Sequence, residues 1–108
     1  MSSEKKNVIK VSKRLDASNV AEFKSESLAN LKHQEKGIII DFSETTFLDS
    51  AGLGSLVSIL KMAAQSGNRK IALASLSKQV RQIFELTKLY RLFDIFDTVE
   101  EAKTFLEK

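Results

Sequence analysis

Residues 47–56 constrain this chain most, because they join a short apolar run to an amphipathic one through two glycines. The upstream run, residues 37–42, is short and rich in isoleucine, which is typical of a strand buried on both faces. Downstream, apolar residues recur at helical spacing: Leu53, Leu56, Val57, Leu60 and Ala64. Asp49 and Ser50 are both good N-cap residues, so we expect a helix that begins there and presents a serine hydroxyl at its N-terminus.

The rest of the chain continues the alternation of strands and helices. Strands are predicted over residues 8–13, 37–42, 70–74 and 95–98. Helices are predicted from Asp16 or Ser18 to before Gly37, from Ser50 to about Gln65, from Ser77 through Thr87, and over 99–106. In the third helix we expect four residues to face inward: Val80, Ile83, Phe84 and Thr87. This order predicts one α/β domain, with a small, mostly parallel sheet of about four strands and about four helices.

Composition excludes several classes of function. There is no cysteine and His33 is the only histidine, so thiol chemistry, zinc clusters and a serine–histidine triad are not expected. The net charge of +3 comes from the first 16 residues, while the other 92 carry 12 basic and 12 acidic groups. A basic nucleic-acid-binding face is therefore not expected. The sequence shows neither an apolar stretch of about 20 residues nor a signal peptide, so we expect no membrane contact and a cytoplasmic location.

Three motifs invite functional interpretations that their context does not support. The glycines at 52 and 54 lack the third glycine of a dinucleotide loop and the lysine of a phosphate loop, so we expect them to let the helix pack closely on the sheet. Asp41 lacks the acidic pair of a receiver domain and is expected to form hydrogen bonds at a strand end. Residues 88–93 mix basic and aromatic side chains, as RNA-binding surfaces do, but core packing under the last loop is favoured because acids adjoin them.

Residues 38–42 followed by Phe-Leu-Asp-Ser-Ala-Gly-Leu-Gly at 47–54 resemble the signature of STAS domains, specifically of bacterial anti-sigma-factor antagonists. The Leu15-Asp16 pair, the apolar pattern over 80–89 and the segment 97–102 extend the resemblance over about residues 8–106. It implies a STAS domain over residues 8–108, preceded by a short polar arm over residues 1–7. The family usually has one more strand before the strand predicted at Val8, so we expect either that this sheet lacks that strand or that residues 1–7 pair irregularly.

The resemblance assigns a role to Ser50, because in that family the serine after the aspartate is phosphorylated. The surrounding motif is Asp49, Ala51, Gly52, Leu53 and Gly54. The unphosphorylated protein is implied to bind an anti-sigma serine kinase of the histidine-kinase-like ATPase type and to free its sigma factor. Phosphorylation of Ser50 would abolish binding, and a PP2C-type phosphatase would reset the switch. The implied protein is not an enzyme, needs no cofactor or metal, and is a monomer on its own.

A partner surface is expected around the serine, on the exposed side of its helix and at the edges of neighbouring loops. Its expected members are Asp16, Thr45, Thr46, Ser55, Ser58 and Lys61. The family's small residue before Leu-Asp is replaced by Lys13-Arg14, a departure that bears on the choice of partner. The alternative function is a STAS module that is never phosphorylated, acting as a scaffold or subunit, for example in a lipid-transport complex. In that case Ser50 only caps its helix.

Overall fold

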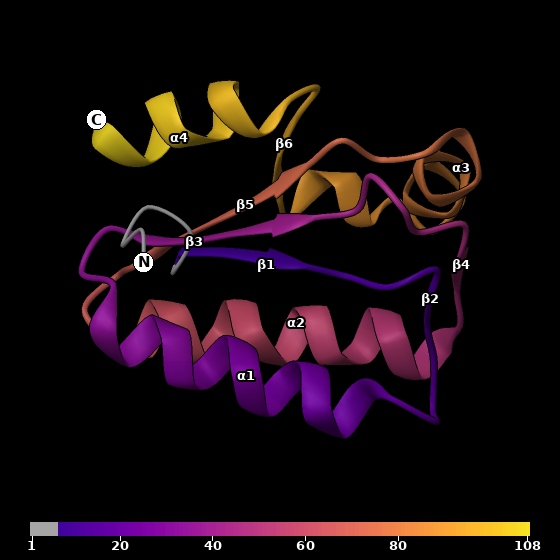
Figure 1. Ribbon diagram of the computed structural model, residues 1–108, viewed down its shortest axis with the longest axis horizontal. Coiled ribbons are helices and arrows are strands. Elements are labelled where there is room, and N and C mark those ends of the chain that lie inside the picture. The colour runs from indigo at the N-terminus through magenta and orange to yellow at the C-terminus, as the bar shows by residue number, and fades with distance from the viewer. Residues whose placement is uncertain (1–6) are drawn as a thin grey trace.

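A four-stranded, fully parallel sheet forms the centre of the computed structural model, which describes residues 7–108 (Figure 1). The strand order is β1-β3-β5-β6, and every pairing is parallel. The elements are β1 (Val8–Lys10), β2 (Arg14–Leu15), α1 (Val20–His33), β3 (Gly37–Asp41), β4 (Phe47–Leu48), α2 (Ser50–Gln65), β5 (Lys70–Ala74), α3 (Lys78–Thr87), η2 (Leu89–Arg91), β6 (Asp94–Phe96) and α4 (Val99–Glu107). The predicted fold class, with four helices around a small parallel sheet, is confirmed.

The two faces of the sheet carry helices of different number and residues of different size. Helices α1 and α2 lie side by side on one face, and α4 lies on the other (Figure 1). Because side chains alternate along a strand, Ile38 and Ile40 join the core under α1 and α2, whereas Ile39 joins the smaller cluster under α4. On β5 the residues on the α4 side are Ala72 and Ala74, and both are fully buried. Their small size leaves room for α4 close to the sheet.

The carboxyl edge of the sheet holds the elements that cover neither face. Here β2 and β4, two residues each, pair in parallel as a separate ribbon, with Arg14 opposite Phe47 and Leu15 opposite Leu48. Helix α3 packs against β4 and the 3₁₀ turn η2 at the same end of the molecule (Figure 1). The β2–β4 ribbon was not predicted, because strands of two residues carry no readable alternation.

Several predicted boundaries need correction. The first strand ends at Lys10 rather than at residue 13. Helix α1 begins after Asn19, which forms no side-chain cap, so neither Asp16 nor Ser18 is its N-cap. Thr87, expected to face inward, is exposed and donates a hydrogen bond from its hydroxyl to the Ile83 carbonyl at 2.8 Å. The question of a strand before Val8 concerns residues 1–6, which lie outside the described part of the chain.

Candidate functional site

Asp49, and not Ser50, caps helix α2. Its Oδ1 atom accepts a hydrogen bond from the Gly52 backbone N–H at 2.8 Å, the contact that defines a side-chain N-cap. Ser50 is therefore the first helical residue, and its side chain is exposed. Within residues 7–108 the Ser50 hydroxyl makes no hydrogen bond. The helix start is thus stabilised by the aspartate, and no hydrogen bond within residues 7–108 depends on the adjacent serine hydroxyl.

The second oxygen of Asp49 joins the helix start to a distant loop. Asp49 Oδ2 accepts from the Ala17 backbone N–H at 3.1 Å, across 32 positions of sequence. That loop is itself fixed by Asn19, whose amide donates to the Arg14 carbonyl at 2.8 Å and whose oxygen accepts from the Asp16 N–H at 2.9 Å. The turn that carries Ser50 is therefore held from two sides before any partner arrives.

Asp16 is a charged residue in the same loop, and its side chain is held by two neighbours. Its carboxylate accepts from the Ser18 hydroxyl and pairs with the Arg14 guanidinium at 2.6 Å. The Ser18 hydrogen bond, and after it the one from Arg14, lowers the pKa of Asp16 below its ordinary value of 3.8. Asp16 thus remains ionised at neutral pH close to the start of α2.

The two glycines after Ser50 differ in the space that surrounds them. A Cβ atom at Gly52 would lie 2.4 Å from the Leu15 carbonyl oxygen, so only glycine allows α2 to approach the β2–β4 ribbon this closely. A Cβ atom at Gly54 would meet nothing within 4 Å. The expectation that both glycines serve close packing is confirmed for Gly52 and wrong for Gly54. Gly54 leaves a flat, exposed surface one helical turn beyond Ser50.

Two of the residues expected on the partner surface are buried. Ser55 is 6% exposed and donates to the Gly52 carbonyl at 2.7 Å, so placing it on the exposed side of the helix is wrong. Thr45 is fully buried and donates to the Ser12 carbonyl at 2.8 Å. By contrast, Thr46 and Lys61 are exposed, and Asp16 and Ser58 are half-buried.

Helix α2 is rotated relative to the predicted apolar stripe. Its buried residues are Gly52, Ser55, Leu56, Ile59 and Ala63, whereas Ala64 is exposed. Leu53, Val57 and Leu60 are partly buried at the side of the core. The predicted stripe omitted Ile59, which is fully buried, and also Gly52 and Ser55, which are buried although neither carries a large apolar side chain. The line of exposed or half-buried residues along α2 is therefore Ser50, Gly54, Ser58 and Lys61, at successive helical turns.

Comparison with known proteins agrees with this architecture. The family model of the STAS domain matches residues 3–102. The chain belongs to the STAS domain family. A solved structure described as an anti-sigma factor antagonist from Thermotoga maritima is 30% identical and superposes with a TM-score of 0.80, covering 94% of this chain and 89% of that one. The match begins at residue 3, inside the segment predicted as a polar arm.

Two more distant structures share the fold of this STAS domain. An anti-sigma-factor antagonist domain protein from Planctomyces limnophilus is 22% identical, with a TM-score of 0.82 and coverage of 94% of this chain and 90% of that one. The antagonist SpoIIAA in its unphosphorylated form is also 22% identical, with a TM-score of 0.68 and coverage of 93% and 87%. At this identity the likeness concerns the fold alone.

Sequence reasoning missed one exposed pair beside the serine of the STAS motif. The Arg14 guanidinium lies 5.0 Å from the centre of the Phe47 ring, a cation–π contact between paired positions of β2 and β4. Phe47 is 42% exposed although it is a large apolar residue. The sequence does hint at these two residues, because Arg14 directly precedes the Leu15-Asp16 pair and Phe47 is the first residue of the serine motif. Their contact depends on the pairing of β2 with β4, which the sequence does not reveal.

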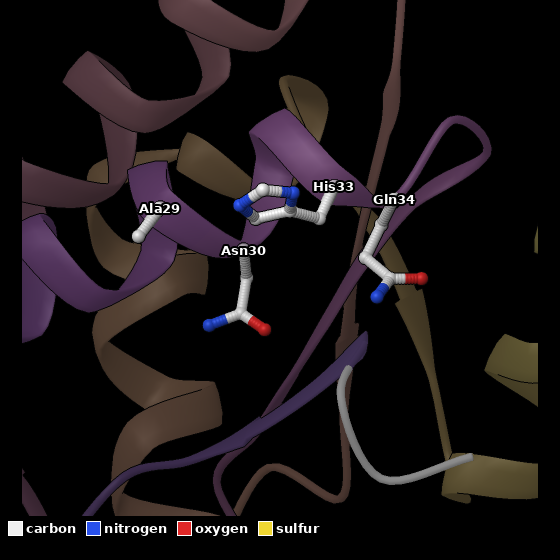
Figure 2. Close-up of a pocket in the computed structure, with 4 residues that line it drawn as sticks. All are labelled: Ala29, Asn30, His33 and Gln34. Carbon is white, nitrogen blue, oxygen red and sulfur yellow. The ribbon is translucent and has the colours of Figure 1, made fainter. Parts of the chain in front are cut away.

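The only histidine of the STAS domain lies far from this turn. His33 is exposed, as expected, and with Ala29, Asn30 and Gln34 it lines a shallow hollow of about 460 Å³ (Figure 2). All four residues come from the end of α1, and none of them is acidic. Within residues 7–108 no group of three or more histidine, aspartate or glutamate side chains is placed to hold a metal ion. In the same range, every helix is too short or too polar to cross a bilayer.

Proposed function

We propose that this STAS domain is an anti-sigma-factor antagonist that is switched by phosphorylation of Ser50. Its unphosphorylated form binds an anti-sigma serine kinase of the histidine-kinase-like ATPase type, which releases a sigma factor. The phosphorylated form no longer binds, and a PP2C-type phosphatase restores it. In this proposal the domain acts by binding and catalyses no reaction itself.

The proposal rests on one observation at the start of α2: the helix is capped by one residue, Asp49, while the next residue, Ser50, is exposed. Asp49 supplies the cap through Gly52, so the exposed Ser50 hydroxyl is free to be modified. The alternative, a scaffold that is never phosphorylated, explained Ser50 as a helix cap. Asp49 fills that role, so capping no longer explains the serine at this position. Family membership and the 30% identical antagonist add independent support.

A phosphate on Ser50 would act locally. It adds about −1.5 to −2 charges at neutral pH, which the N-terminal end of α2 tolerates in the free protein. In a complex the same group would be buried beside the Asp49 carboxylate, whose two oxygens already accept from Gly52 and Ala17. Like-charge repulsion and the cost of removing water from the phosphate would then oppose binding. No change of fold is required, so the switch can consist of this charge alone.

The proposed partner surface follows the exposed line of α2 from Ser50 through Gly54 and Ser58 to Lys61, with Asp16 and Thr46 at its margin. Gly54 offers a partner close access to the helix backbone, because, apart from its neighbours in the helix itself, no heavy atom of residues 7–108 lies within 4 Å of the place that a Cβ atom would take. Ser55 and Thr45 stay outside the proposed surface because they are buried.

Calorimetry with purified candidate kinases tests this function. Ser50→Ala should bind the kinase as the native chain does, because the hydroxyl has no structural contact. Ser50→Asp should bind more weakly, by about tenfold or more, although a carboxylate imitates a phosphate only in part. Native affinity for Ser50→Asp, together with equal binding of phosphorylated and unmodified chains, would show that charge at this position is not the switch.

A further inference from the structure

Three large apolar side chains are exposed within seven residues at the corner formed by α3 and η2. Leu86 is 85% exposed, Leu92 is 52% exposed and Tyr90 is 46% exposed. The sequence favoured core packing for residues 88–93, and the structure divides them. Leu89 and Phe93 pack against the core, whereas Tyr90 and Leu92 face solvent. Exposed apolar groups gathered in this way are typical of contact surfaces.

This corner is held in one conformation by internal contacts. Phe84 and Phe93 meet edge to face with ring centres 5.9 Å apart beneath it. Lys88 adopts a left-handed conformation with φ of 61°, and its N–H donates to the Glu85 carbonyl at 3.2 Å. The Leu92 N–H donates to the Leu89 carbonyl at 2.9 Å. The three exposed side chains are therefore presented by an ordered backbone, which reduces the entropy lost when a partner binds.

The charges around the corner favour a protein as its occupant. Lys88 and Arg91 lie between the apolar residues, and Glu85 and Asp94 flank them, so the signs balance. A nucleic acid or an anionic membrane would require a clear positive excess. Leucine and tyrosine with an arginine at the rim instead match the apolar centre and polar margin of protein–protein contacts.

The corner is too small to act alone, and α3 connects it to β4, next to the Ser50 turn. A stable protein interface buries roughly 800 Å² on each partner, which three side chains cannot supply. Helix α3 packs against β4, which carries the exposed Phe47 three residues before Ser50. The Ser77 hydroxyl at the start of α3 donates to the Thr45 carbonyl at 2.6 Å and fixes these elements to each other. Because α3 joins the two places, one protein that covers the carboxyl edge of the sheet and the length of α3 would contact both.

We propose that Leu86, Tyr90 and Leu92 form a docking surface for the kinase that phosphorylates Ser50. This inference rests on the proposed function and adds a second contact region to it. The kinase would present an apolar depression to the three side chains and carboxylates to Lys88 and Arg91. The surface adds contact area to the complex of the kinase with the unphosphorylated chain, and phosphorylation of Ser50 ends that complex.

The test is steady-state phosphorylation of the full chain by the kinase that modifies Ser50, with ATP and with Leu86→Ser and Leu92→Ser as variants. The KM for the chain should rise by about tenfold or more in each variant while kcat is unchanged, because docking residues do not touch the reacting hydroxyl. The melting temperature should stay at the native value, since both side chains are exposed. Met62→Ser is the matched control, because Met62 is 43% exposed near the opposite end of α2 and should leave KM unchanged.

Three results would overturn the inference in distinguishable ways. A native KM in both leucine variants, with Ser50 still phosphorylated, would remove the docking surface and leave the proposed function standing. A concentration-dependent dimer that is lost in Leu86→Ser, with native kinetics, would assign the corner to a second copy of the chain. Absence of phosphate on Ser50 in the native chain, with every candidate kinase, would remove the proposed function and the docking surface together.

Discussion

At the amino edge of the sheet, cationic side chains have structural partners at the ends of helices. Arg69 donates to the Leu31 carbonyl, and Lys70 donates to the Phe105 carbonyl at 3.0 Å. Lys36 pairs with Glu107 at 2.7 Å. The first two contacts give a second donor to carbonyls in the last turns of α1 and α4, and all three place positive charge where the helix dipole favours it. The polar groups at this edge thus contribute to stability.

At the carboxyl edge, hydrogen bonds to a side chain also fix the backbone, but neighbouring side chains remain exposed. Asp49 holds Gly52 and Ala17, while Ser50 makes no bond within the described residues and Phe47 remains 42% exposed. Under the proposed function, the amino edge contributes to stability alone, whereas the carboxyl edge combines backbone contacts that stabilise the fold with exposed groups for recognition. Substitutions at the two edges should therefore have different consequences, which can be measured.

The largest effect on stability is expected from Gly52→Ala. A new Cβ atom 2.4 Å from the Leu15 carbonyl oxygen must displace backbone, so we expect a loss of about 1–3 kcal/mol in the free energy of unfolding. Gly54→Ala is the matched control, because its Cβ atom meets nothing and alanine favours the helix by up to about 1 kcal/mol. Urea denaturation of both variants measures the difference. Equal stabilities would mean that α2 does not approach the ribbon as described.

A smaller effect is expected at the amino edge from Arg69→Met. Methionine keeps most of the apolar contact but removes the donor to the Leu31 carbonyl, so we expect a loss of about 0.5–1.5 kcal/mol. Kinase binding, measured by calorimetry on the folded variant, should be native. Loss of binding without loss of stability would contradict the division of roles between the two edges.

The smallest effect concerns acid stability and involves one carboxylate at each edge. Asp16 has its pKa lowered by Ser18 and Arg14, and Glu107 has its pKa lowered by Lys36. A depressed pKa in the folded state stabilises the protein above the unfolded pKa, and this stability is lost as pH falls through the folded pKa. Asp16→Asn and Glu107→Gln should each reduce the loss of stability below about pH 4. If both variants lost stability with falling pH as the native chain does, these exposed ion pairs would contribute nothing to the stability of the fold.

The sequence predicts the parts of this molecule that depend on local pattern. The strand at 70–74, the helix from Ser50 to Gln65 and the Ser77 cap of α3 follow from spacing and capping residues, and the structure confirms them. The rotation of α2 was missed because the predicted stripe omits Ile59 and because Gly52 and Ser55 are buried without large apolar side chains, which hydrophobicity does not record. The Arg14–Phe47 contact and the exposure of Leu86 depend on long-range packing, so they became visible only in the structure.

The most direct test of the central claim is mass spectrometry of the intact chain after incubation with ATP and the candidate kinase. The free, exposed hydroxyl of Ser50 predicts one added phosphate on the native chain, mapped by fragmentation to Ser50, and none on Ser50→Ala. Phosphate found on Thr46 or Ser55, or retained in Ser50→Ala, would contradict the account.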